Sequence, residues 1–492
     1  MVADLTAMCK KFGLLFLLVL PAFALTPGNT SNRPLPNIIL IYMDDMGYGD
    51  LSCYGGLNVH TPQLDKLAAE GIRFTNFLTT QAVCSASRAS LLTGCYANRV
   101  GISGALWPIA GIGLSLEETT IAELLKQKKY ATAAFGKWHL GDVKGYLPRN
   151  HGFDQYYGIP YSNDMWPVWY DGTPAKPGTN KFNYPPLPLI EGDEKVGTIN
   201  SLDEQAQLTK QLTDKTLEFI DKNKARPFFV YLAHPMPHVP INASKAFRGK
   251  SKQGLYGDVI QEVDANVGRI VTKIHELGLD KNTLVIFSSD NGPWLNFGNH
   301  AGSAGGFREG KGTSFEGGHR VPCIMRWKGT IPSGIVANQL ASTIDIFPTI
   351  AAITQTQLPS NKIDGVDLLP LLKGNLSLTP RTSFYYYYRK NALEAVRQDH
   401  WKLVFEHPSR SYAGQAPGKD GFPGNAPEDI MMPKALYDLR RDPGEVYDVQ
   451  QQYPEVVRML EALAEEARSD LGDELQKRTG MHTREAAIIK YK

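Results

Sequence analysis

The chain contains the stretch Asn37-Ile38-Ile39-Leu40-Ile41-Tyr42-Met43-Asp44-Asp45, an apolar, β-branched run that ends in two carboxylates. A continuous apolar run of this length is typical of a strand buried on both faces, as in parallel sheets covered by helices. Similar runs recur at Tyr130 to Phe135, Pro227 to Ala233 and Thr283 to Ser289. The central sheet of the fold is therefore expected to be mainly parallel.

Helical patterns lie between these runs. They cover Thr61 to Glu70, Glu117 to Lys128, Leu202 to Asn223 and Tyr256 to Leu277. Gly71 and Gly278 follow the first and the last of them, as is common at helix C-termini. Strands that alternate with helices predict an α/β fold, with a large, mostly parallel (mixed) sheet sandwiched by helices.

The remaining segments lack this alternation. Residues 141–200 are rich in Gly, Pro and aromatic residues without clear periodicity, and we expect long loops there. After about Pro380, strand-like runs precede a helical run from Pro454 to Leu471; they are Phe384 to Arg389, Leu393 to Arg397, Trp401 to Phe405 and Ala435 to Asp438. We expect a catalytic domain over residues 25–380 and a smaller α+β subdomain with an antiparallel sheet over residues 381–492.

The N-terminus has the pattern of a secretory signal peptide. Two lysines precede the apolar run Phe12 to Leu20, and Pro21-Ala22-Phe23-Ala24 supplies an A-x-A cleavage pattern. The apolar run is too short to span a bilayer. We therefore expect cleavage after Ala24, no transmembrane anchor and an exported protein, periplasmic or secreted.

Composition narrows the classes of function. The chain has 492 residues, is 42% hydrophobic and carries a net charge of only +2 with basic and acidic residues interspersed. This composition is compatible with an enzyme or a binding protein. It gives no sign of nucleic-acid or membrane-surface binding. Four cysteines remain after the signal peptide, which predicts one disulfide or none: Cys53, Cys84, Cys95 and Cys323.

Polar residues follow the ends of the four central strands. The carboxyl ends of parallel strands meet at one edge of the sheet, where ligands bind in open α/β folds. The residues predicted to meet there are Asp44, Asp45, Lys137, His139, His234, His238, Asp290 and Asn291. They predict one composite site. His234 and His238 compete for one role, although the prolines around His238 restrict where its ring can lie.

Four of these residues offer oxygen ligands that suit a hard divalent cation such as Ca²⁺ or Mg²⁺. They are Asp44, Asp45, Asp290 and Asn291. Either pair alone is explained as well by a turn or a helix cap. Two such pairs at strand ends of one sheet favour a metal site.

A further candidate is Cys84, which begins a predicted helix with Arg88 four residues later. The two side chains share a helix face, and the first helical turn offers free N–H groups to an anion. A buried structural cysteine beside a surface arginine is the simpler interpretation of this motif alone. Lys311, between Gly310 and Gly312, could approach a ligand closely, although the segment lacks P-loop spacing.

In their order along the chain, these elements resemble the type I sulfatases of the alkaline-phosphatase superfamily, especially the arylsulfatase A and N-acetylgalactosamine-6-sulfatase group. The resemblance covers nearly the whole mature chain. The segments that carry it are Asp44-Asp45-x-Gly47, Cys84 to Gly94, Gly136 to Gly141, His151 to Asp154, Ser289 to Gly292, Gly310 to Gly318, Asp364 to Asp367 and Leu436 to Leu439.

The resemblance implies that a maturase converts Cys84 to Cα-formylglycine, whose hydrate attacks a sulfate monoester and forms a sulfo-enzyme intermediate. It also implies that Ca²⁺ (or Mg²⁺) is held by residue 84 together with Asp44, Asp45, Asp290 and Asn291. The other implied catalytic residues are Arg88, which orients the hydrate, Lys137 and His139 beside it, and His238 and Lys311 at the sulfate, one of which protonates the leaving alcohol. Ser162 is implied as a further sulfate contact.

The sequence departs from the commonest family pattern at Ala86, where many members carry proline. The C-x-A-x-R form resembles substrates of radical-type anaerobic maturases in bacteria. With the signal peptide, this departure predicts an exported bacterial enzyme.

The substrate predicted is a sulfated carbohydrate, of galactose or N-acetylgalactosamine type. Alternatives are a phosphodiesterase or phosphonate hydrolase of the same superfamily, and a non-catalytic binder of sulfated glycans in which Cys84 stays a thiol. The loops expected to select the substrate are 104–112, 161–190, 294–308 and 408–432. Their tryptophans, which could stack on a sugar or only anchor packing, are Trp107, Trp166, Trp169 and Trp294.

Overall fold

Strand β1 (Asn37–Met43) lies inside a ten-stranded mixed sheet of the computed structural model, which describes residues 34–488. The strand order is β12-β2-β11-β10-β1-β9-β5-β6-β7-β8. The parallel centre consists of β10 (Thr283–Ser289), β1, β9 (Phe228–Ala233), β5 (Ala131–Lys137) and β6 (Gln155–Ile159). The four predicted strands are thus confirmed as neighbours in one sheet.

The strands at the two edges of this sheet are antiparallel to a neighbouring strand or only three residues long. On one side lie β11 (Cys323–Arg326), β2 (Ile72–Phe74) and β12 (Ile335–Ala337), and on the other β7 (Leu187–Glu191) and β8 (Glu194–Ile199). The expectation of loops throughout 141–200 was therefore wrong for β6, β7 and β8. Strands β7 and β8 are partly exposed and mix polar with apolar residues, so they lack the continuous apolar pattern of a buried strand.

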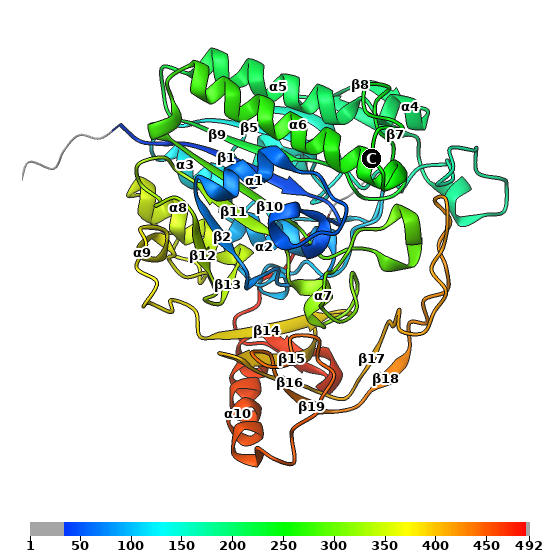
Figure 1. Ribbon diagram of the computed structural model, residues 1–492, viewed down its shortest axis with the longest axis vertical. Helices are drawn as coiled ribbons and strands as arrows, with labels where there is room; N and C mark the ends of the chain where they lie inside the picture. Colours follow the sequence, from blue (N-terminus) through cyan, green and yellow to red (C-terminus); the bar gives the residue numbers. More distant parts are fainter. Residues whose placement is uncertain (1–33, 489–492) are drawn as a thin grey trace, which may run out of the picture. The chain divides into compact units, whose positions relative to one another are not determined.

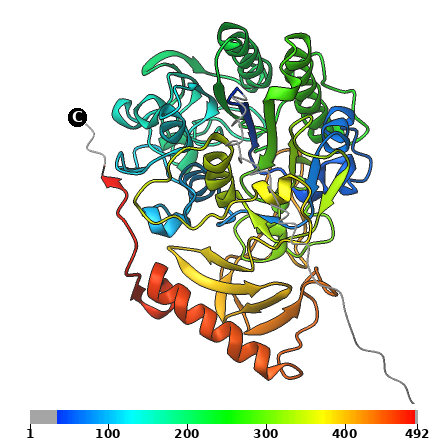
Figure 2. The ribbon, with the colours of Figure 1, turned by 90° about the vertical axis from the view of Figure 1, so that its left-hand side faces the viewer.

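Helices cover both faces of the sheet (Figures 1 and 2). Alternate side chains of β1 point to opposite faces. Ile39, Ile41 and Met43 belong to the core beneath α1 (Pro62–Ala69), α5 (Leu208–Asn223) and α6 (Gly254–Glu276). Ile38, Leu40 and Tyr42 belong to the core beneath α2 (Cys84–Thr93), α3 (Ile121–Lys126) and α8 (Ile346–Thr354). The predicted α/β sandwich is confirmed.

Two of the predicted helices are interrupted or shortened for local reasons. The helix expected over Glu117–Lys128 begins only after Thr120, whose side chain accepts from the Glu123 amide while Glu123 accepts from the Thr120 amide. The helix expected over Leu202–Asn223 is divided into α4 (Leu202–Gln205) and α5. Helices α1 and α6 match their predicted ranges to within two residues at each end.

The C-terminal part of the chain forms an antiparallel four-stranded sheet, as predicted. Its order is β14 (Ser383–Tyr388), β15 (Ala392–Gln398), β16 (Trp401–Val404) and β19 (Ala435–Asp438), and α10 (Pro454–Leu471) packs against it (Figure 2).

Helices α7 (Glu316–His319) and α9 (Leu369–Leu372) are short. The short strand pairs are β3 (Phe77–Leu78) with β13 (Ala341–Ser342), β17 (His407–Ser409) with β18 (Ile430–Met432), β20 (Gly472–Asp473) with β21 (Arg478–Thr479), and β4 (Ile112–Gly113) with β22 (Ala487–Ile488). The boundary near residue 380 stays a prediction.

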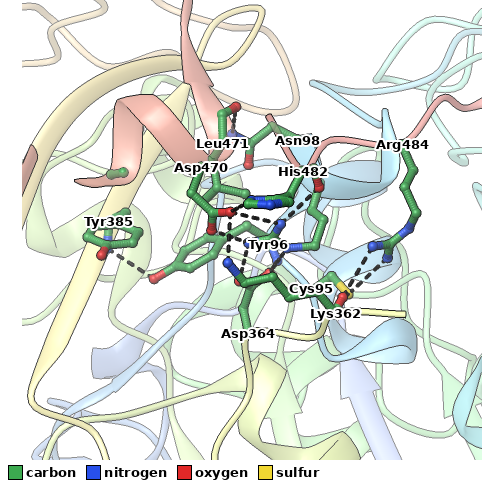
Figure 3. A network of polar contacts seen from close by, with 12 residues as sticks. Cys95, Tyr96, Asn98, Lys362, Asp364, Tyr385, Asp470, Leu471, His482 and Arg484 are labelled. Carbon is green, nitrogen blue, oxygen red and sulfur yellow. Dashed lines mark hydrogen bonds and ion pairs between the residues drawn. The ribbon is translucent and has the colours of Figure 1, made fainter. Parts of the chain in front are cut away.

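A buried arginine joins the C-terminal segment to the main sheet region. Arg99 lies 2.6 Å from Asp364 (Nη2 to Oδ1) and 2.6 Å from Asp470 (Nη2 to Oδ2), and its side chain has no exposed area. The Arg484 guanidinium donates to the Cys95 sulfur and the Lys362 carbonyl (Figure 3). It also binds the Glu118 carboxylate, so the segment that carries Arg484 is held by a charge-assisted contact. This network ties residues after α10 to the segment that follows α2.

In the described part of the chain, all four cysteines are free and no helix is long and apolar enough to cross a membrane. The lack of a disulfide agrees with the predicted limit of one or none. The predicted signal peptide, residues 1–24, lies outside the described residues.

We expect Arg99→Ala to destabilise the protein by about 3–5 kcal/mol, because the substitution leaves Asp364 and Asp470 without their buried cation. The measurement is the midpoint of thermal unfolding at a fixed heating rate. Arg441→Ala is the control, since that side chain is 75% exposed. Equal midpoints for the two variants would contradict a stabilising role for the network.

Candidate active site

The predicted polar residues at the strand ends lie together and are buried. They are Asp44, Asp45, Lys137, His139, His238, Asp290 and Asn291. The in-register pairing of Met43 with Ser289 places Asp44 beside Asp290 at the same edge. Asp45 and His139 adopt left-handed backbone conformations directly after their strands, which turns the chain sharply at the site.

Cys84 is the first residue of α2, where the helix's free N–H groups lie. Its sulfur, Asp44 and Asp290 offer ligand atoms within 4.8 Å of one another. Arg88, one turn later, lies 2.7 Å from Asp290 (Nη2 to Oδ2) and 3.6 Å from Asp44 (Nη2 to Oδ2). Arg88 is fully buried, so the alternative of a surface arginine beside a structural cysteine is wrong.

Residues 104–106 lie against the start of α2 and hold His139. The Leu106 amide donates to Ser85 Oγ at 2.9 Å, and the Leu106 carbonyl lies 2.7 Å from His139 Nε2. Burial, with the positive charges of Lys137 and Arg88, lowers the pKa of His139 well below its usual value. A neutral ring that donates from Nε2 leaves Nδ1, which is buried without a partner, as a proton acceptor.

Lys137 bridges two strand ends. Its Nζ donates to Asp44 Oδ2 at 2.6 Å and to Ser162 Oγ at 3.0 Å. Burial opposes ionisation of Asp44, but nearby cations, Lys137 first among them, outweigh it and hold the pKa of Asp44 far below its usual value. The predicted contact residue Ser162 is thus part of the same charged cluster.

Lys311 and His238 approach Asp45 from the other side. Lys311 Nζ lies 2.8 Å from Asp45 Oδ1, and His238 Nε2 lies 3.6 Å from Asp45 Oδ2. Burial alone would lower the pKa of Lys311, but the Asp45 carboxylate outweighs it and raises that pKa above its usual value. Burial lowers the pKa of His238, and Asp45 opposes the shift. Lys311 therefore keeps its proton more firmly than His238.

The geometry distinguishes the two competing histidines. His238 faces Asp45, and its Nδ1 lies 2.6 Å from the Val239 carbonyl, which fixes the ring. His234 is buried with both ring nitrogens unpartnered, and burial lowers its pKa to about 4. The structure therefore favours His238 as the site residue.

Asp164 was missed from the sequence. Its carboxylate receives a hydrogen bond from Ser162, and although burial opposes ionisation, His238 and Lys181 keep its pKa below its usual value. The neighbouring Asn163 donates to the His238 carbonyl at 3.2 Å. Both residues lie in the loop after β6 (Gln155–Ile159), close to Ser162, so predicting β6 as a strand would have directed attention to this loop.

The residues present fit a divalent cation. Asp44 Oδ1 and Asn291 Oδ1 are buried acceptors without a hydrogen-bond partner, an arrangement that is costly unless a donor or cation satisfies them. Burial and the nearby Asp44 carboxylate raise the pKa of Asp290 to about 7, so the two carboxylates repel each other. A cation between them would relieve that repulsion, and their oxygens are the ligands that hard cations prefer.

Models of sulfatase families match most of the chain. Residues 36–356 match the model described as Sulfatase, and residues 379–488 match the model of the C-terminal region of aryl-sulfatase. Together these matches span the ten-stranded sheet and the four-stranded sheet.

Named relatives match over most of their length. Arylsulfatase A from Homo sapiens is 38% identical over 462 residues, 89% of this chain and 89% of that protein. N-acetylgalactosamine-6-sulfatase from Canis lupus familiaris is 38% identical over 456 residues, 87% of this chain and 84% of that protein. The solved structure of Ps i-CgsB in complex with k-i-k-neocarrahexaose has a TM-score of 0.72 and 27% identity, covering 88% of this chain and 92% of that one.

We expect Ca²⁺ to raise the thermal unfolding midpoint of the protein, because the buried oxygens that fit a cation are brought together only in the folded chain. The gain corresponds to about 2.7 kcal/mol at a hundredfold excess over the dissociation constant. Asn291→Leu should remove most of the shift, whereas Asn200→Ala, at an exposed position, should retain it. A shift that survives Asn291→Leu would place the cation elsewhere.

Proposed function

The chain belongs to the sulfatase family and is a sulfuric ester hydrolase, and we propose that it removes sulfate from a sulfated carbohydrate of galactose or N-acetylgalactosamine type. The observation that carries this proposal is the buried Cys84, surrounded by the Asp44 and Asp290 carboxylates and the cations of Arg88, Lys137 and Lys311. The named N-acetylgalactosamine-6-sulfatase relative and the carrahexaose bound to Ps i-CgsB support a saccharide substrate.

The cysteine is a precursor in this proposal rather than the nucleophile. Burial raises the pKa of the Cys84 thiol, which disfavours the reactive thiolate. We propose that a maturase converts Cys84 to formylglycine, whose hydrate supplies the attacking oxygen. Because Cys84 is only 2% exposed in the folded chain, its conversion to formylglycine would precede folding. Ala86, two residues later, is consistent with a maturase of the radical type.

The carboxylate cluster would hold the metal ion, for which we propose Ca²⁺, with Mg²⁺ as the alternative. The ligands are residue 84, Asp44, Asp45, Asp290 and Asn291. When bound, the ion neutralises charge on the sulfate oxygens. Arg88 keeps Asp290 in place, while Lys137 and Lys311 supply fixed positive charge for the sulfate, together with the Ser162 hydroxyl.

Two histidines would move the protons. His139 Nδ1 is unpartnered and accepts the proton of the residue-84 hydrate. His238 would donate a proton to the departing sugar oxygen from its protonated form, which the Asp45 carboxylate 3.6 Å from Nε2 favours against burial. Groups positioned in this way contribute about 10²–10⁴-fold to rate.

One further proposal comes from the N-terminal sequence. The N-terminal pattern through Ala24 supports export, to the periplasm or beyond the cell. The phosphodiesterase and phosphonate hydrolase alternative is not favoured, since the relatives that are 38% identical over most of the chain are sulfatases. The non-catalytic glycan binder is likewise not favoured.

The function is tested by purifying the natively matured protein, measuring the mass of the peptide that contains residue 84, and screening sulfated galactose and N-acetylgalactosamine. We expect the thiol to be replaced by an aldehyde, and sulfate release to fall at least 10³-fold in Cys84→Ala. The same screen with phosphate esters is the comparison. An unmodified thiol, or phosphate esters turned over faster than sulfate esters, would overturn the proposal.

His238→Asn should slow hydrolysis of a sugar sulfate about 10²–10⁴-fold but slow an aryl sulfate with an acidic phenol much less, because a phenolate leaves without a proton. Lys311→Met is the matched variant, expected to slow both substrates similarly because its charge acts on the sulfate itself. The measurement is kcat/KM of the wild type and of each variant with the sugar sulfate and with the aryl sulfate. Equal losses in His238→Asn on both substrates would exclude His238 as the proton donor.

A further inference from the structure

The four loop tryptophans differ sharply in exposure. Trp166 is 1% exposed and belongs to the core, so it anchors packing, whereas Trp107 is 55% exposed. We propose that Trp107 and Tyr184 form a second sugar-binding subsite, which holds the ring adjacent to the sulfated sugar. The inference rests on the proposed sulfatase activity and narrows its substrate to an oligosaccharide or polysaccharide.

The subsite is continuous with the catalytic residues through the chain itself. Trp107 directly follows Leu106, whose carbonyl holds His139 and whose amide donates to Ser85, the neighbour of Cys84. Ala105 packs against the cluster that contains Cys84. Trp107 therefore follows directly on a residue that contacts the catalytic cluster, which is why we place the adjoining ring of the substrate on it.

The two aromatic rings stack on each other, and Trp107 keeps 55% of its area exposed. The Trp107 and Tyr184 ring centroids are 6.0 Å apart and the planes differ by 9°, so the rings are parallel and offset. Trp and Tyr combine an apolar face with a polar edge, which suits a pyranose ring that presents C–H groups on its face and hydroxyls at its rim.

Both loops are fixed without a ligand. The Lys181 ammonium, three residues before Tyr184, donates to the Asp164 carbonyl at 2.6 Å and lies 4.2 Å from the Tyr170 ring centroid. On the other loop, the Ile109 amide donates to Asp142 Oδ2 at 2.9 Å. A surface held in this way costs little ordering entropy when a sugar binds.

Trp294 has different neighbours from Trp107. Trp294 lies against charged groups, with its ring centroid 4.6 Å from Lys311 Nζ and 5.6 Å from the His238 ring centroid. That position suits the sulfated ring, since Lys311 and His238 are the proposed sulfate contacts. Trp107 and Tyr184 would then hold its unsulfated neighbour.

The experiment compares kcat/KM for N-acetylgalactosamine 4- and 6-sulfate with that for the matching chondroitin sulfate tetrasaccharides. We expect the tetrasaccharide to be preferred about tenfold by the wild-type enzyme, and Trp107→Ala to bring the ratio close to one. Trp107→Phe should retain part of the preference. Tyr447→Ala, which removes another exposed aromatic ring (71%), is the control and should keep the full ratio.

Binding gives a second measurement. Calorimetry with Cys84→Ala should show tighter binding of the tetrasaccharide than of the monosaccharide, and Trp107→Ala should remove that difference. Equal kcat/KM for both lengths in an active wild-type enzyme would overturn the subsite while leaving the sulfatase activity intact. Wild-type protein that releases sulfate from none of these probes would overturn the galactose-type substrate and the subsite together.

Discussion

The structure depends on neutralising the charge of two carboxylates, Asp44 and Asp290. They are buried beside each other at the ends of adjacent parallel strands. Charges removed from water are costly unless they are paired, and like charges at this distance raise that cost further. Arg88 and Lys137 supply part of the compensation. The carboxyl oxygen of Asp44 that remains unpartnered is what a divalent cation would bind, so one electrostatic requirement explains the helix position, the lysine and the proposed metal.

The fold meets this requirement through register and layering. In-register pairing of β1 with β10 sets the two carboxylates at one edge, and α2 packs on the sheet so that Arg88 reaches both of them. The C-terminal part also shapes the site. Glu309, close to Lys311 in the chain, accepts hydrogen bonds from Ser411 and from the Tyr412 amide, so the loop after β17 is fastened to the segment that carries Lys311.

Sequence reasoning was most successful where burial leaves a strong pattern. The run Asn37–Met43 has no polar residue after its first position, and both the strand and the polar cluster at its end were predicted from it. Strands β7 and β8 were missed because partly exposed strands carry no such pattern, and β6 was missed because its five residues begin with a glutamine and include a glycine. Asp164, in the loop after β6, was missed with it. Trp107 and Trp166 could not be separated, since only the packing of the loops decides which ring is buried.

The central claim is that residue 84 and the buried carboxylates form one metal-dependent centre. The most direct measurement is a crystal structure of the natively matured protein grown with Ca²⁺, with anomalous scattering used to locate the ion. The account predicts an aldehyde or its hydrate at residue 84 and an ion bound by Asp44 Oδ1 and Asn291 Oδ1. A thiol at residue 84, or an ion bound away from these oxygens, would contradict it.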